Sequence, residues 1–170
     1  MSARPTYLIH LDWQGPIPWK ERDKLNDEVK DYGIYQIYGC HANYGVDTLL
    51  YIGKAEKQTF ATRLKQETGW MFDQDRERLS IYVGRCYGWH GTPSVKVWEE
   101  QINLAEKLLI LAHQPTYNSQ KGSWRNPKLQ HVHVLNWGCH RSLFPEVSGW
   151  RQGCKFDNEK KYKAFEYHGK

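Results

Sequence analysis

One carboxylate in the longest helical stretch of the chain stands where an ordinary helix would carry an apolar side chain. Residues 95–113 show apolar side chains at helical spacing, and on a helical wheel Glu106 falls between Ile102 and Ile110. A carboxylate among apolar neighbours costs free energy unless it is paired, hydrogen-bonded or bound to a metal. Glu106 is therefore the first candidate for a functional residue, and a metal ion is one of the partners that could hold it.

Two tyrosines form the second candidate. Residues 33–54 read GIYQIYGCHANYGVDTLLYIGK, in which the triplets GIY and YIG flank a turn-forming string and predict an antiparallel hairpin. Strand side chains alternate between faces, so a pairing that buries Ile34 with Ile52 would place Tyr35 and Tyr51 together on the other face. Tyrosine pairs also stabilise ordinary sheets. The hairpin alone therefore fits a site and a purely structural role.

Two basic side chains follow the hairpin. Lys54 comes directly after YIG, and Arg63 lies in a short predicted helix, FATRLKQE, for which Thr59 is the expected N-cap. Both could bind a phosphate. The structural alternative for Lys54 is a solvated loop lysine. For Arg63 it is an i,i+4 ion pair with Glu67, worth roughly a few tenths of a kcal/mol.

Taken in order, these motifs resemble the GIY-YIG nuclease superfamily. The similar region covers residues 32–118 and includes GIY, YIGKA, the helix that bears Arg63, Glu106 within LAEKLLILAHQP, and PTYN, which ends at Asn118. The stretch from YIGKA to PTYN is particularly similar to the nuclease domain at the N-terminus of the bacterial excision-repair protein UvrC. Because the flanks are short, a stand-alone endonuclease of the restriction or phage type is also expected to fit the pattern.

The resemblance implies a metal-dependent phosphodiesterase, a hydrolase that cuts DNA. Glu106 would hold a single divalent cation, Mg²⁺ or Mn²⁺. Tyr51 would be the general base that takes a proton from the attacking water, and Tyr35 would position that water or the phosphate. The two tyrosine roles are open to exchange. A phenol has a pKa of about 10, so it needs a nearby cation to act as a base at neutral pH.

The resemblance also assigns three supporting residues. Arg63 would bind the scissile phosphate, Lys54 would lower the pKa of the catalytic tyrosine, and Asn118 would buttress the site. One departure bears on these roles. Four residues after Arg63, where relatives often have His or Tyr, this chain has Glu67. An acid at that position could pair with Arg63 and reduce its reach to phosphate.

The elements that carry these residues follow the order strand, strand, helix, strand, helix, which predicts an α+β fold. The expected architecture is a small three-stranded antiparallel sheet flanked by helices. Three segments are expected along the chain: an N-terminal extension over residues 1–31, the nuclease core over 32–118, and a basic, Trp-containing C-terminal extension over 119–170.

Basic side chains are concentrated in the last segment. Residues 119–170 carry 10 Lys and Arg against 4 Asp and Glu, so they account for the whole net charge of +5. Trp124, Trp137 and Trp150 are interleaved with them, a composition that favours a polyanion with stackable bases. Double-stranded DNA is the expected partner. One active site cuts one strand, so double-strand cleavage would require a homodimer or two binding events.

Three functions are compatible with the pattern. The first is a DNA endonuclease that depends on a divalent metal and could be sequence-specific. The second is a nucleic-acid-binding module of the same fold with little or no catalysis, which the Arg63–Glu67 spacing keeps open. The third is a structural domain with two incidental tyrosines. No apolar run approaches the roughly 18 residues of a membrane span, and a cytoplasmic protein is expected.

Overall fold

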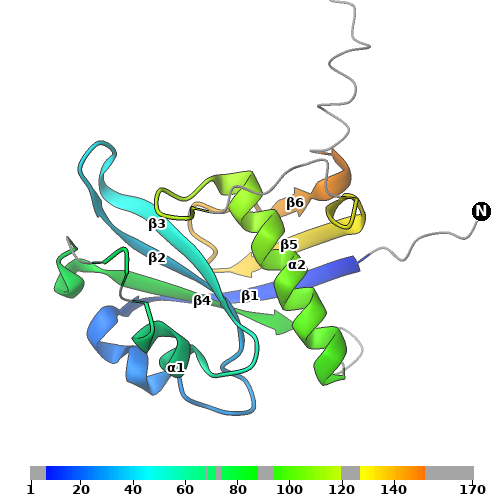
Figure 1. Ribbon diagram of the computed structural model, residues 1–170, viewed down its shortest axis with the longest axis horizontal. Coiled ribbons are helices and arrows are strands. Elements are labelled where there is room, and N and C mark those ends of the chain that lie inside the picture. Colours follow the sequence, from blue (N-terminus) through cyan, green and yellow to red (C-terminus); the bar gives the residue numbers. More distant parts are fainter. Residues whose placement is uncertain (1–6, 68, 72–73, 88–93, 120–126, 152–170) are drawn as a thin grey trace, which may run out of the picture.

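A computed structural model describes residues 7–67, 69–71, 74–87, 94–119 and 127–151 (Figure 1). Along the chain lie β1 (Tyr7–Pro18), η1 (Trp19–Lys24), β2 (Gly33–His41), β3 (Gly45–Ala55), α1 (Phe60–Lys65), η2 (Arg76–Arg78), β4 (Ser80–Tyr87), α2 (Val95–His113), η3 (Leu129–His131), β5 (Val132–Gly138) and β6 (Glu146–Ser148), where η marks a 3-10 helix.

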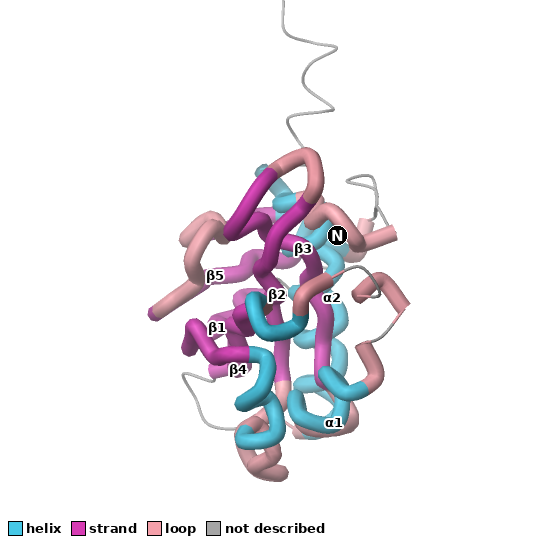
Figure 2. The backbone as a smooth tube through the Cα atoms, turned by 90° about the vertical axis from the view of Figure 1, so that its left-hand side faces the viewer, coloured by secondary structure: helices cyan, strands magenta, loops and turns pink. Residues whose placement is uncertain are grey.

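All six strands belong to one sheet, in the order β3-β2-β4-β1-β5-β6. The neighbours β1 and β5 run parallel, while the other four pairs are antiparallel. The sheet is twisted and curled, and α2 lies across it (Figures 1 and 2). Because β3 and β6 form the two edges, the hairpin that carries the tyrosines lies at one edge of the sheet.

The prediction of a small three-stranded sheet flanked by helices is wrong. The predicted strands are present as β2, β3 and β4, and the strand-like run LQHVHVL contributes to β5. Together with β1 and β6, β5 extends the sheet to six strands of mixed direction. The sequence of β1 does not predict an inner strand, because Pro16 and Pro18 interrupt its pattern and proline is normally excluded from inner strands. The structure accommodates Pro16 at an irregularity between Gln14 and Ile17 in the pairing with β4.

Each face of the sheet supports a hydrophobic core. The larger core lies beneath α2 and contains Ile34 and Ile52 together with Leu108. The smaller core contains Tyr35 together with Phe60, the first residue of α1. The predicted alternation of the hairpin is therefore confirmed: the two isoleucines face one core, and the tyrosines face the other.

The two predicted helices are both present, whereas a third stretch with helical composition forms only a short 3-10 helix. The predicted helix over residues 95–113 is α2 with the same bounds, and Thr59 caps α1 by accepting a hydrogen bond from the backbone N–H of Thr62. Residues 19–32 have a helical composition, but only η1 forms there. In the described part of the chain, no helix is long and apolar enough to cross a membrane.

Candidate active site

The two triplets bring Tyr35 and Tyr51 together diagonally across the hairpin. Tyr35 pairs with Gly53, and Ile37 pairs with Tyr51. The ring centroids of the two tyrosines lie 6.2 Å apart. Pairing then shifts at Leu50, which stands between the paired residues Leu49 and Tyr51 without a partner of its own. Such a bulge re-aims side chains beside it, and here Leu50 and Tyr51 both face the smaller core.

The glycines of both triplets have steric reasons to be glycine. A Cβ on Gly53 would lie 2.4 Å from the Tyr35 ring, so the tyrosine of GIY lies over the glycine of YIG. Gly33 has a φ of +140° and approaches β4 so closely that a Cβ would lie 2.2 Å from the carbonyl oxygen of Gly84. Both positions require a residue without a side chain. The triplets thus specify the packing of the hairpin as well as its tyrosines.

Tyr35 is fully buried and its hydroxyl faces another side chain. The hydroxyl donates a hydrogen bond to Glu67 Oε1 over 2.6 Å, and the ring packs edge-on against Phe60. Burial, followed by the nearby charge of Glu67, raises the pKa of Tyr35 well above its usual value. Tyr35 is therefore a neutral phenol that is hydrogen-bonded within the protein.

Glu67 connects three side chains although it is itself 94% buried, with 6% of its surface exposed. Besides the hydrogen bond from Tyr35, Oε1 forms an ion pair with Arg63 Nη2 at 2.6 Å. Oε2 accepts a hydrogen bond from Trp70 Nε1 at 2.9 Å. The i,i+4 ion pair considered from the sequence is therefore present. The spacing from Arg63 was the only signal in the sequence. The bonds to Tyr35 and Trp70 were missed because they depend on how the segment after α1 packs against β2.

Tyr51 is the more accessible of the two tyrosines. It is partly buried at the edge strand and stacks on Trp70 with ring centroids 5.1 Å apart. Burial and the charge of Glu67 raise the pKa of Tyr51 to about 12, against the lowering effect of Arg63. The cation that acts on this phenol is thus Arg63, whereas the sequence interpretation gave that role to Lys54.

Glu106 lies on α2 with only 17% of its side chain exposed, as its place among apolar neighbours indicated. Its Oε2 is 3.6 Å from Lys54 Nζ. Burial raises the pKa of Glu106 more than Lys54 lowers it. The charge of Glu106 also raises the pKa values of Tyr51 and Arg63. These residues of three different elements therefore share one electrostatic environment.

Lys54 is the centre of a polar cluster beside Glu106. Its ammonium group also contacts Glu56 Oε2 at 3.2 Å and the side-chain oxygen of Asn103, and the Asn103 amide donates to Glu56 in turn. Two carboxylates and an amide oxygen thus surround a single ammonium. This arrangement accounts for a partly buried lysine on the strand that carries Tyr51, because carboxylates from α2 and from the residue after β3 balance its charge.

Asn118 completes the outer edge of β3. Its Oδ1 accepts from the backbone N–H of Ile52 over 2.9 Å, and its Nδ2 donates to the Ile52 carbonyl over 2.8 Å. The backbone N–H of Tyr117 donates to the Leu50 carbonyl nearby. An edge strand presents unpaired backbone groups. Asn118 satisfies both backbone groups of Ile52, the residue between Tyr51 and Gly53, and so fixes the strand that carries the tyrosine.

The donor set suits one loosely held hard cation better than an enclosed metal centre. In the part of the chain that the structure describes, no three His, Cys, Asp or Glu side chains are grouped to hold a metal ion. Lys54 pairs with Oε2 of Glu106, while Oε1 has no ion-pair partner among the described residues. A carboxylate oxygen is a ligand that Mg²⁺ accepts, usually with several waters and substrate phosphate oxygens.

Comparisons with known proteins add nothing to this geometry: no protein-family model, curated protein or solved structure matches the chain. The resemblance to the GIY-YIG nucleases therefore stays a prediction from the sequence motifs.

Proposed function

We propose that the protein hydrolyses phosphodiester bonds in DNA with the help of Mg²⁺ or Mn²⁺. The observation that carries this proposal is a series of contacts around β3. Glu106 of α2 lies 3.6 Å from Lys54, three residues after Tyr51. The ring of Tyr51 lies 6.2 Å from that of Tyr35, and Tyr35 shares Glu67 Oε1 with Arg63 of α1. A structural hairpin would not require a carboxylate that is costly to bury on a helix from another part of the chain. Metal-assisted hydrolysis of a phosphodiester uses a phosphate ligand, a water-activating group and a cation site.

Glu106 would hold the cation, through the carboxylate oxygen that Lys54 leaves unpaired. When bound, the cation supplies Lewis-acid polarisation of the phosphate and neutralises the leaving oxygen. A single protein carboxylate gives weak affinity, so phosphate oxygens of DNA are expected to complete the coordination sphere. Lys54 partly neutralises the site while no cation is present, because its single ammonium pairs with both Glu106 and Glu56.

Arg63 would bind a non-bridging phosphate oxygen and stabilise the charge that develops on it. About a quarter of its side chain is exposed, so the guanidinium can be reached from solvent while one of its nitrogens holds Glu67. Tyr51 would take the proton of the attacking water. Because its pKa is about 12 in the resting site, proton abstraction by Tyr51 requires an ionised phenol that is rare at neutral pH. Activity is therefore expected to increase towards alkaline pH.

Double-stranded DNA is the proposed partner, and a homodimer would allow both strands to be cut. Support comes from the basic C-terminal part of the sequence, where Trp137 and Trp150 are 53% and 54% exposed. Trp124 lies outside the described residues. Exposed aromatic rings beside basic side chains favour stacking on bases.

The direct test is nicking of supercoiled plasmid with Mg²⁺ or Mn²⁺ by the wild type, Glu106→Gln and Glu100→Gln. Glu100 lies on the same helix but is exposed and bonded to Tyr7, so it is a matched control. We expect Glu106→Gln to lose nicking and Glu100→Gln to retain it. Equal rates for the wild type and Glu106→Gln would overturn the proposal.

A nucleic-acid-binding module without catalysis is the second candidate. The observation that favours it is the commitment of Arg63 to the buried Glu67, next to a tyrosine with a raised pKa. Binding to DNA that weakens steeply with salt, without cleavage under any divalent metal between pH 6 and about pH 10, would identify this alternative.

A further inference from the structure

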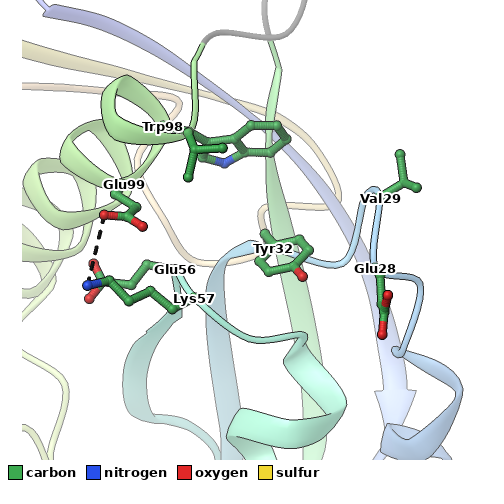
Figure 3. A pocket seen from close by; sticks show the side chains of 8 residues that line it. Glu28, Val29, Tyr32, Glu56, Lys57, Trp98 and Glu99 are labelled. Atoms are coloured by element: carbon green, nitrogen blue, oxygen red, sulfur yellow. Dashed lines mark ion pairs between the residues drawn. The ribbon is translucent and has the colours of Figure 1, made fainter.

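A pocket separate from the tyrosines opens between the start of α2 and the loop before β2. Its volume is about 480 Å³, which lies within the usual range for small-molecule sites. Trp98 of α2 and Tyr32 supply aromatic rings, and Figure 3 shows one lying above the other with a gap between them. Both side chains are partly buried. Two rings facing a common space suit a planar ligand that can stack.

Carboxylates line the same space. Glu56 and Glu99 lie on one side, and Glu28 lies on the other (Figure 3). Lys57 is the cation of the lining, and it pairs with Glu99 over 4.0 Å. Ionised carboxylates only accept hydrogen bonds. The pocket therefore favours a planar group with N–H donors and disfavours a phosphate, which would meet acids of its own sign.

The pocket adjoins the candidate active site through Lys54. The Lys54 ammonium lies 3.2 Å from Glu56 in the pocket wall and 3.6 Å from Glu106 on the other side. The Lys54 ammonium group therefore lies between the two sites. The separation of the Glu56 and Glu106 carboxylates across it is comparable to the distance from one nucleotide to the next. A nucleotide whose phosphate lies at Glu106 and Arg63 can direct a base, its own or that of a neighbour, into the pocket.

We propose that this pocket receives a guanine base that is unstacked from the DNA strand beside the phosphate to be cut. This inference rests on the proposed nuclease function. Enzymes that act on nucleic acids read unstacked bases by stacking between aromatic rings and by hydrogen bonds to the Watson–Crick edge. Tyr32 and Trp98 provide the stacking, and Glu99 provides the hydrogen-bond acceptors.

Guanine is the base whose donors match one carboxylate. Its N1–H and N2–H₂ groups point the same way, so both oxygens of Glu99 can accept from it, as they accept from the fork of an arginine. Cytosine and adenine each offer an amino group beside an acceptor nitrogen, and thymine offers one N–H between two carbonyls. Glu99 is better suited than Glu56, because Glu56 already binds Lys54 and Asn103.

Binding without cleavage tests the pocket separately from catalysis. The probe is a single-stranded oligo-dT with one central guanine, hypoxanthine or thymine, mixed with the wild-type protein in EDTA and followed by fluorescence anisotropy. We expect thymine to bind about tenfold more weakly than guanine. Hypoxanthine, which lacks the N2 amino group, should fall between them.

The variant Glu99→Gln should remove the preference for guanine, because an amide offers one acceptor and one donor in place of two acceptors. Glu100→Gln, the exposed neighbour on the same helix, should keep it. Equal binding of the three oligonucleotides by the wild type, or an unchanged preference in Glu99→Gln, would overturn the proposal. So would binding of tetramethylammonium that guanosine does not displace, since the pocket would then be an organic-cation site.

The two proposals fail in different ways. Guanine preference in EDTA with no nicking of plasmid under any divalent metal would retain the pocket and reject the nuclease. Metal-dependent nicking without any base preference, in binding and in cleavage, would retain the nuclease and reject the pocket.

Discussion

The hydroxyl of Tyr35 donates a hydrogen bond to Glu67 Oε1 over 2.6 Å, and the same oxygen forms an ion pair with Arg63 Nη2 at 2.6 Å. A single buried carboxylate oxygen thus joins a tyrosine of β2 to the arginine of α1. The resemblance assigns both of these residues to phosphate chemistry, yet in the structure each directs a polar group at Glu67. Glu67 therefore restrains Arg63 from reaching a phosphate and adds to the rise in the pKa of Tyr51 that burial causes.

Replacing Glu67 tests this relationship. Glu67→Gln keeps an oxygen for Tyr35 but removes the charge that holds Arg63 and raises the pKa of Tyr51. We expect nicking at pH 7.5 to become several-fold faster and the free energy of unfolding to fall by about 1–3 kcal/mol. Initial nicking rates and urea denaturation measure the two effects. Nicking as slow as that of Arg63→Ala would mean that Glu67 positions Arg63 for phosphate instead of restraining it.

The pH dependence of nicking tests Tyr51 as the base. The active form is the ionised phenol, whose fraction increases tenfold per pH unit below its pKa of about 12. We expect the rate to rise with that slope from about pH 7 to about pH 10 without reaching a plateau. In Tyr51→Phe this pH-dependent activity should be lost, while circular dichroism remains unchanged. A plateau near neutral pH in the wild type would assign the base to another group.

The burial of Glu106 leads to a prediction about the pH dependence of stability. Burial raises its pKa above 4.5, so the folded state favours the protonated form and stability is lost as pH increases through that range. Glu106→Gln removes this cost, and we expect its melting temperature at pH 7 to equal or exceed that of the wild type. The difference should disappear below about pH 4, where both forms are neutral. A melting temperature at pH 7 well below that of Glu100→Gln would instead mean that the Lys54 ion pair stabilises the fold.

Gly53 tests the packing of the two triplets. Gly53→Ala places a Cβ 2.4 Å from the Tyr35 ring, and we expect a loss of about 1–3 kcal/mol of unfolding free energy. Gly69→Ala is the control, because open space surrounds that position. In a double-mutant cycle, Tyr35→Leu should recover part of the loss by removing the ring. Additive effects would show that the ring and the glycine do not interact.

The predicted hairpin, α2 and the cap of α1 could be found from the sequence because each depends on local spacing. The alternation of Ile34 and Tyr35 and the helical period around Glu106 are visible within a few residues of each position. The convergence of Arg63 with Tyr51 could be expected only through the resemblance, since spacing alone does not relate one element to another.

What could not be predicted depends on distant partners. β1 carries prolines and pairs with β5 from the far end of the chain, so no local pattern marks it as an inner strand. The same holds for the charge balance at Lys54. Its partners Asn103 and Glu106 come from α2, and the sequence around Lys54 shows only a loop lysine.

The parallel pairing of β1 with β5 has a consequence for how the protein folds. Tyr7 of β1 pairs with Val132 of β5. β1 is synthesised first, so its pairing with β5 can form only after most of the chain has been synthesised. Pairing between residues so distant carries a large loop-closure entropy and slows folding. The hairpin with Tyr35 and Tyr51 can form early, but the face of β1 that packs beneath α2 is complete only after β5 arrives. During synthesis on the ribosome, this protein is therefore expected to hold an exposed strand edge that chaperones would recognise.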